Sequence, residues 1–140
     1  MKTVLLAPSG VVASSLGQLA LPRTTDDLFA VAAESVDAPI DAVTLRLRGA
    51  ELIRRVEGTL GGSPAGRMLV RLSPLDRGRR FAAAVRGDAE ARRRIAEADL
   101  IVVLERDGLL AGWKAAHRWA APHASVVYGL AAARAAASGG

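Results

Sequence analysis

The sequence predicts a doubly wound α/β domain with a mostly parallel five-stranded sheet. Short aliphatic segments recur along the 140 residues with helical patterns between them, which is the order of a βα repeat. Residues 100–104 (LIVVL) contain no charge, as expected for a strand that helices cover on both faces. Aromatic residues make up only 4% of the chain, so aliphatic side chains must build the core. The length is that of one domain, residues 1–140.

Five segments are predicted to form the strands. They are residues 3–7 (TVLLA), 42–47 (AVTLRL), 67–72 (RMLVRL), 99–105 (DLIVVLE) and 124–130 (ASVVYGL). Residues 24–36, between the first two segments, are predicted to form a helix that Thr25 caps. Leu28, Val31, Ala32 and Val36 are spaced to line its buried face.

Residues 42–48 allow two interpretations. Val43, Leu45 and Leu47 alternate with polar residues, as in a half-buried strand. The alternative is a helix that starts at Asp41 and runs to about residue 61. We predict a strand to about Arg48, followed by a helix from residue 50.

Capping residues place the later helices. Ser73 before Pro74 predicts a helix start, and Gly87 with Asp88 predicts a division of the following segment into two helices or one bent helix. Asp107 is predicted to cap the next helix. Its inward stripe is expected to contain Leu109, Leu110, Trp113, Ala116 and Ala120. The chain then closes with an Ala-rich helix and a flexible tail from about residue 138.

Charge gives weak evidence of an anionic partner. The net charge is +5, and acidic residues are interspersed with the arginines, which dilutes any patch of one sign. The main basic cluster contains Arg77, Arg79, Arg80, Arg86, Arg92, Arg93 and Arg94. Phe81 is the only aromatic residue near it, so a solvated face is favoured. Nucleic-acid binding through this Arg-rich segment is the less favoured alternative.

Several kinds of site are not indicated. The chain has no cysteine, no G-x-G-x-x-G and no P-loop, and His117 and His123 lack zinc-site spacing. We therefore expect no cofactor and no metal. No apolar run reaches the length of a membrane span, and residues 2–9 (KTVLLAPS) are more typical of a buried strand than of a signal peptide. A cytoplasmic setting is expected.

The predicted topology indicates the position of a binding site, although the sequence contains no binding motif. In doubly wound sheets, ligands bind where loops leave the carboxyl ends of the strands. Glu105 is the candidate of greatest interest, because no capping role is apparent for it, although a plain turn is the alternative for residues 105–108. No catalytic residue is assigned. The ligand-binding candidates are Ser9, Gly10, Ser73, Glu105, Arg106, Asp107 and Tyr128.

The layout also resembles a known family. KTVLLAPSG (2–10), GRMLVRLSP (66–74) and ADLIVVLERDGLLAGWKAAHR (98–118), followed by ASVVYGLAAA (124–133), resemble the amino-terminal half of bacterial glycosyltransferases with two Rossmann-like domains. The resemblance implies a Rossmann-like fold and a sugar or nucleotide-sugar ligand. In that family the amino-terminal half mainly holds the acceptor, and the other half holds the nucleotide sugar.

The sequence departs from the family pattern at two points, and both concern catalysis. Some branches carry a catalytic histidine in the first loop, where this chain has Ser9, Ser14 and Ser15. The 140 residues also contain no donor-binding half. We therefore expect ligand binding without the complete catalytic machinery. The alternative is an interaction or assembly protein that binds a protein partner or forms a homo-oligomer through residues 130–137 or the Trp119 side.

Overall fold

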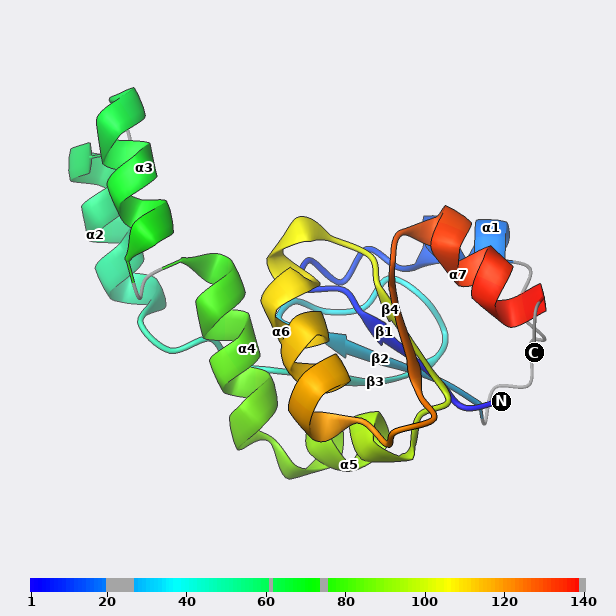
Figure 1. The fold of residues 1–140 in the computed structure, drawn as a ribbon. Helices are drawn as coiled ribbons and strands as arrows, with labels where there is room; N and C mark the ends of the chain where they lie inside the picture. Colours follow the sequence, from blue (N-terminus) through cyan, green and yellow to red (C-terminus); the bar gives the residue numbers. More distant parts are fainter. Residues whose placement is uncertain (20–26, 61, 74–75, 139–140) are drawn as a thin grey trace.

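The computed structural model describes residues 1–19, 27–60, 62–73 and 76–138, which form an α/β domain around one sheet (Figure 1). Its strands are β1 (Thr3–Leu6), β2 (Leu28–Ala32), β3 (Asp41–Thr44), β4 (Leu100–Val103) and β5 (Ser125–Tyr128). They follow the order β3-β2-β1-β4-β5, and every neighbouring pair is parallel. The order reverses between β1 and β4, as in Rossmann-like folds. The predicted five-stranded doubly wound fold is confirmed.

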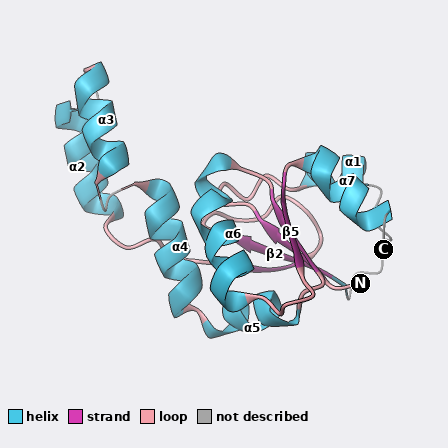
Figure 2. Cartoon of the chain, viewed as in Figure 1, coloured by secondary structure: helices cyan, strands magenta, loops and turns pink. Residues whose placement is uncertain are grey.

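Helices cover both faces of the sheet (Figure 2). One face carries α4 (Arg77–Gly87), α5 (Ala89–Glu97) and α6 (Leu109–Lys114), and the other carries α1 (Ala13–Leu19) and α7 (Leu130–Ser138). β1 serves both cores, because Val4 and Leu6 belong to one hydrophobic cluster and Leu5 and Ala7 to the other. This alternation within a fully buried strand fixes its register between two helical layers.

The predicted helix over residues 24–36 is wrong, because residues 28–32 form strand β2, between β3 and β1. Thr25, its expected cap, lies outside the described residues. A short apolar run such as LFAVA fits a buried strand and a buried helix equally well by periodicity alone. Pairing with β1 and β3 decides the outcome in favour of a strand. The residues after Ala32 therefore leave the carboxyl end of the sheet.

The predicted strand over residues 67–72 is also wrong. These residues end α3 (Pro64–Leu72), which forms a hairpin with α2 (Ala50–Leu60) that projects away from the sheet (Figure 1). Pro64 begins α3, and the Ser63 hydroxyl accepts a hydrogen bond from the Gly66 backbone N–H at 3.0 Å, as in a capped helix start. Exposed apolar side chains on this hairpin are Leu52, Met68 and Leu69.

Residues 42–48 begin in a strand, and a helix follows, as predicted. The strand ends earlier than the predicted residue 48. β3 ends at Thr44, and α2 begins at residue 50. The predicted division at Gly87 and Asp88 is confirmed, since Asp88 follows α4 and accepts a hydrogen bond from the Ala91 N–H as the cap of α5. Ser73 is not the cap of α4, because Asp76 has that role.

The predicted inward stripe of the helix after β4 is largely wrong. Leu109 and Trp113 are exposed, whereas Ala111, Ala115 and Trp119 are buried. The helix lies close to β4 through a small residue: a Cβ added at Gly112 would lie 2.4 Å from a methyl group of Val103. Trp119 is only 8% exposed, so its ring adds little to the surface that was named as one option for assembly.

The end of the chain forms the expected Ala-rich helix, α7, through Ser138. Of the predicted tail, residues 139 and 140 lie outside the described residues. Among the helices that the described residues form, none combines the length and apolar character needed to cross a membrane.

Candidate functional site

Two predicted site residues meet at the point where the strand order reverses. The loop after β1 leads to α1 on one face of the sheet, and the loop after β4 leads to α6 on the other. The Ser9 backbone N–H donates to both carboxylate oxygens of Glu105 at 3.2 Å, and the Ser9 hydroxyl donates to Oε1 at 2.5 Å. Glu105 therefore has a structural role that its sequence context did not indicate: it ties the first loop to the fourth strand.

Gly10 has a conformation and a position that require glycine. Its φ is +77°, and an added Cβ would lie 2.3 Å from the Ser35 carbonyl oxygen. The Gly10 carbonyl in turn accepts a hydrogen bond from the Asp37 N–H at 3.1 Å. The loops after β1 and β2 therefore lie against each other, and at Gly10 they leave no room for a side chain.

The start of α1 is already satisfied by a carboxylate of the chain. Asp37 Oδ1 accepts hydrogen bonds from the backbone N–H groups of Val12 at 2.6 Å and Ala13 at 2.8 Å. These hydrogen bonds hold the pKa of the Asp37 carboxyl below its usual value. In nucleotide-binding relatives of this fold, the first helix N-terminus receives a phosphate. Here Asp37 occupies the equivalent position.

Arg77 connects the loops after β2 and β4. Its guanidinium donates to Glu34 Oε1 at 2.5 Å, and its Nε lies 3.8 Å from Asp107 Oδ2. Asp107 was predicted to cap the following helix, which is wrong: Gly108 precedes α6 without a side-chain cap. The 3₁₀ turn Arg106–Gly108 separates β4 from α6 and leaves Asp107 free to face Arg77.

The remaining predicted site residues lie apart from these contacts. Arg106 is exposed in the 3₁₀ turn, and Tyr128 is 53% exposed at the end of β5. Within the described parts of the chain, neither side chain forms a hydrogen bond or ion pair with Ser9 or Glu105. The Ser73 carbonyl accepts the Asp76 N–H at 3.2 Å, just before α4.

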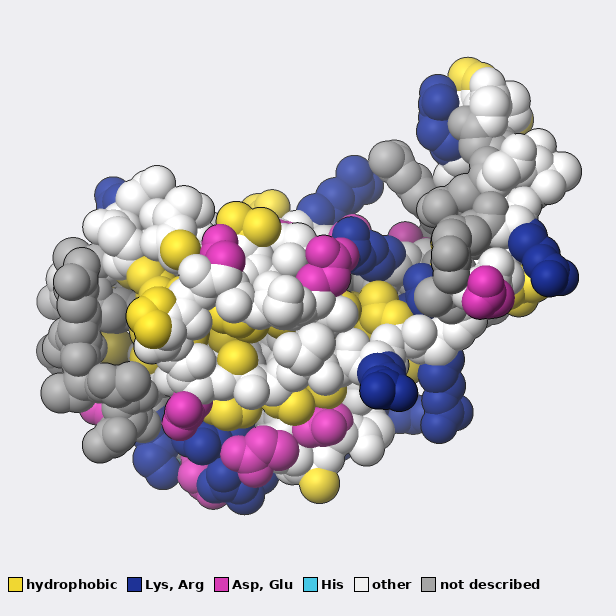
Figure 3. Space-filling view, turned by 180° about the vertical axis from the view of Figure 1, so that it is seen from behind, with side chains coloured by type: hydrophobic (Ala, Val, Ile, Leu, Met, Phe, Trp, Pro, Cys, Tyr) yellow, Lys and Arg dark blue, Asp and Glu magenta, His cyan; other side chains and the backbone are white. Residues whose placement is uncertain are grey.

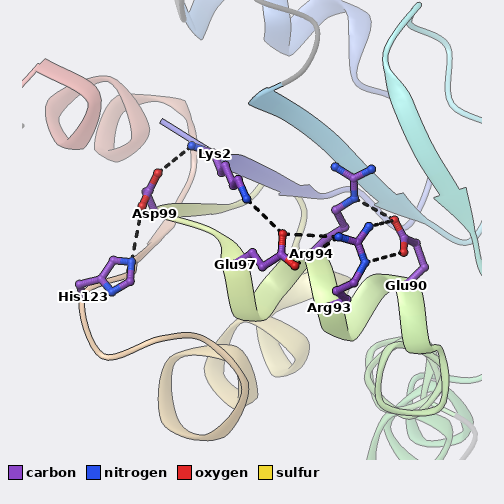
Figure 4. Close-up of polar contacts among 7 residues, drawn as sticks. All are labelled: Lys2, Glu90, Arg93, Arg94, Glu97, Asp99 and His123. Carbon is purple, nitrogen blue, oxygen red and sulfur yellow. Dashed lines mark hydrogen bonds and ion pairs between the residues drawn. The ribbon is translucent and has the colours of Figure 1, made fainter.

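The basic cluster separates into paired and unpaired arginines. On α5, Arg93 binds Glu90 and Glu97, and Arg94 also binds Glu90 (Figure 4). The two arginines lower the pKa of Glu90 to about 2. Arg92 lies over the Trp119 ring at 5.1 Å. The α5 arginines therefore serve the fold, as a solvated and paired face does.

The arginines of α4 include a different group. Arg80 and Arg86 line a groove of about 620 Å³ together with Arg46 and Arg48, which follow β3. Sequence reasoning noted the alternation of these last two residues with leucines but did not connect them with α4. It also missed Glu34 and Asp37. A helix was predicted over residues 24–36, so these two residues were not recognised as following the carboxyl end of a strand.

The histidines and acidic residues do not form a metal site in the structure described. No group of three or more potential ligands comes together among the described residues. His123 lies 3.5 Å from Asp99, which directly precedes β4 at the amino end of the sheet (Figure 4). His117 stacks on Trp113, with ring centroids 4.5 Å apart. Neither histidine therefore belongs to the cluster around Ser9 and Glu105.

Comparisons with known proteins add no relative: no protein-family model matches the chain, and neither the curated proteins nor the solved structures give a significant match. The fold is therefore established by the sheet itself, while function must be argued from the site.

Proposed function

We propose that this Rossmann-like domain binds a sugar-containing ligand at the carboxyl end of its sheet, without the complete machinery for glycosyl transfer. The role corresponds to that of the acceptor-holding half of the glycosyltransferases that the sequence resembles. The observation that carries the proposal is the contact between Ser9 and Glu105, which brings a hydroxyl and a carboxylate together where the strand order reverses.

The polar groups nearby suit a polyhydroxy ligand. Sugar hydroxyls donate and accept hydrogen bonds, and carboxylates, hydroxyls and guanidinium groups supply the complementary partners. Arg77, at the start of α4, joins Glu34 after β2 to Asp107 after β4, and these ion pairs hold the three side chains in place. Side chains that are already oriented lose less conformational entropy when a ligand binds.

Charge favours a neutral sugar over a nucleotide phosphate at this place. The loops carry the carboxylates of Glu34, Asp37, Glu105 and Asp107, while Arg77 is engaged with two of them. The start of α1, which would receive a phosphate, is filled by Asp37. A nucleotide diphosphate would therefore meet these carboxylates and would find the start of α1 already filled.

The test is saturation-transfer NMR of the full chain against glucose, mannose, maltotriose, UDP-glucose and GDP-mannose. We expect the saccharides to receive saturation at the sugar ring. Ser9→Ala should weaken this binding about five- to tenfold, because a sugar hydroxyl loses its partner. In the nucleotide sugars, the sugar protons should receive more saturation than the base protons.

Glu90→Gln is the matched control, since it changes one carboxylate on α5, away from the carboxyl end of the sheet. It should leave saccharide binding within about twofold of the unmodified protein. The proposal fails if no saccharide receives saturation. It also fails if the control weakens binding as much as Ser9→Ala, or if the nucleotide base rather than the sugar makes the contact.

A further inference from the structure

A groove between the segment after β3 and helix α4 is lined largely by arginines. Its volume is about 620 Å³, which is the size of a small-molecule site. In the view from behind, Lys and Arg side chains gather between the body of the domain and the α2–α3 hairpin (Figure 3). The lining residues with charged side chains are Arg46, Arg48, Arg80, Arg86 and Asp88.

Most of this positive charge is not neutralised within the described parts of the chain. Ion pairs there involve the arginines of α5 and Arg77 but none of Arg46, Arg48 or Arg86. Arg86 is exposed on α4, and the other two are exposed after β3. Three guanidinium groups from two separate elements thus face solvent around one groove.

The other two charged residues of the groove have structural contacts. Arg80 donates from Nε to the Arg48 carbonyl at 2.7 Å and from a terminal nitrogen to the Leu47 carbonyl at 3.4 Å. These bonds hold the segment after β3 against α4. Asp88 accepts the Ala91 N–H at 2.8 Å as the cap of α5. Four arginines and one aspartate give the described part of the lining a formal net charge of +3.

We propose that this groove binds a compact phosphate-bearing molecule of the diphosphate class, at a second site separate from the contact between Ser9 and Glu105. Guanidinium groups match phosphate oxygens in pairs, and a diphosphate carries about three negative charges near neutral pH. Among the described residues, the lining contains no aromatic side chain on which nucleic-acid bases could stack. Its volume and charge therefore fit a small anion better than a nucleic-acid strand.

This site does not depend on the proposed sugar site. Arg77, at the start of α4, is engaged by Glu34 and Asp107, whereas Arg80, one turn later, faces the segment after β3. The two sites thus use different side chains of the same helix, and each side chain has its own partners. Loss of diphosphate binding and loss of saccharide binding are expected from different substitutions.

The experiment is isothermal titration of the full chain with inorganic pyrophosphate at low ionic strength. The triple variant Arg46→Gln/Arg48→Gln/Arg86→Gln should bind at least about tenfold more weakly, because it loses the unpaired charges. Arg80 is kept because it holds the groove together. The Nε–Hε signals of Arg46, Arg48 and Arg86 should shift in ¹H–¹⁵N spectra of the unmodified protein as pyrophosphate is added.

The matched control removes the same charge elsewhere, as Arg67→Gln/Arg93→Gln/Arg118→Gln. It should keep pyrophosphate affinity within about threefold at equal salt, because none of these three side chains lines the groove. Equal losses in both variants would show diffuse attraction and overturn the proposal, as would the absence of binding. Binding of a single-stranded oligonucleotide that pyrophosphate does not displace would overturn it in favour of nucleic acid.

Discussion

The carboxyl end of the sheet and the groove between β3 and α4 differ in how far their polar groups are already satisfied. At the carboxyl end, Glu105 accepts hydrogen bonds from Ser9, and Asp37 accepts two from the start of α1. In the groove, Arg46 and Arg48 have no ion-pair partner among the described residues. The sheet topology indicates where this fold can bind a ligand. The hydrogen bonds and ion pairs show which charged side chains have no partner in the described part of the protein and can therefore bind one.

The difference has opposite consequences for stability. Groups that already have partners hold the loops together, so their removal should cost free energy of unfolding. Unpaired charges of the same sign repel one another, so their removal should cost little or stabilise slightly. Substitutions in the two regions therefore test whether this contrast is real.

The largest effect is expected at Gly10. Gly10→Ala places a Cβ 2.3 Å from the Ser35 carbonyl oxygen on a backbone with φ of +77°. Both the strained conformation and the collision with backbone must be relieved, which should cost about 3 kcal/mol of unfolding free energy. Urea denaturation followed by circular dichroism measures this cost.

Gly49, next to the groove, supplies the matched control. Its φ is +80°, yet an added Cβ would meet no atom of the described residues within 4 Å, its two chain neighbours aside. Gly49→Ala should therefore cost only the conformational part, about 1 kcal/mol. If the two substitutions cost the same, the loops at the carboxyl end are not held as tightly as their contacts indicate.

The sequence predicted the fold class well and two elements badly, for one physical reason. Residues 100–104 are uniformly aliphatic, and the strand there was predicted correctly. Residues 28–32 are a short apolar run, and residues 67–72 contain one over 68–70; the periodicity of such short runs does not separate strand from helix. Tertiary contacts decide both cases. β2 forms hydrogen bonds with both neighbouring strands, and α3 packs against α2, and a local sequence pattern does not predict such contacts.

The candidate site was predictable in part for the same reason. Ser9 and Glu105 follow strands that were assigned correctly, and the structure joins them. Glu34 and Asp37 follow the strand that was taken for a helix, so their place at the carboxyl end was not foreseen. For Asp107 the type of residue suggested a cap, but the nearby Arg77 comes from a distant part of the sequence.

A smaller effect is expected at Glu105. Glu105→Gln keeps one acceptor oxygen for Ser9 but loses the charge and the second oxygen, which should cost about 1 kcal/mol of unfolding free energy. Arg48→Gln, which removes a charge in the groove, should change stability by no more than about 0.5 kcal/mol. Urea denaturation measures both changes. A larger loss of unfolding free energy for Arg48→Gln than for Glu105→Gln would show that the groove, and not the carboxyl end, has the side chains that stabilise the fold.

The smallest effect is a pH dependence at Asp37. Hydrogen bonds from Val12 and Ala13 lower the pKa of its carboxyl in the folded protein relative to the unfolded chain. Its contribution to stability is therefore complete above the unfolded pKa of about 3.9 and is lost as the pH falls through the lower, folded pKa. Asp37→Asn removes the charge that produces this dependence.

Thermal unfolding of Asp37→Asn and of the unmodified protein should thus differ most near pH 7 and converge as the pH falls below about 3.9. Asp41→Asn is the control, because the Asp41 side chain is exposed and has no hydrogen-bond partner in the described structure. It should leave Tm unchanged near pH 7. A constant difference between Asp37→Asn and the unmodified protein at all pH values would mean that shape alone matters at the start of α1. In that case a phosphate would compete with residue 37 for the Val12 and Ala13 N–H groups. The carboxyl end would then resemble the groove in its capacity to bind an anion.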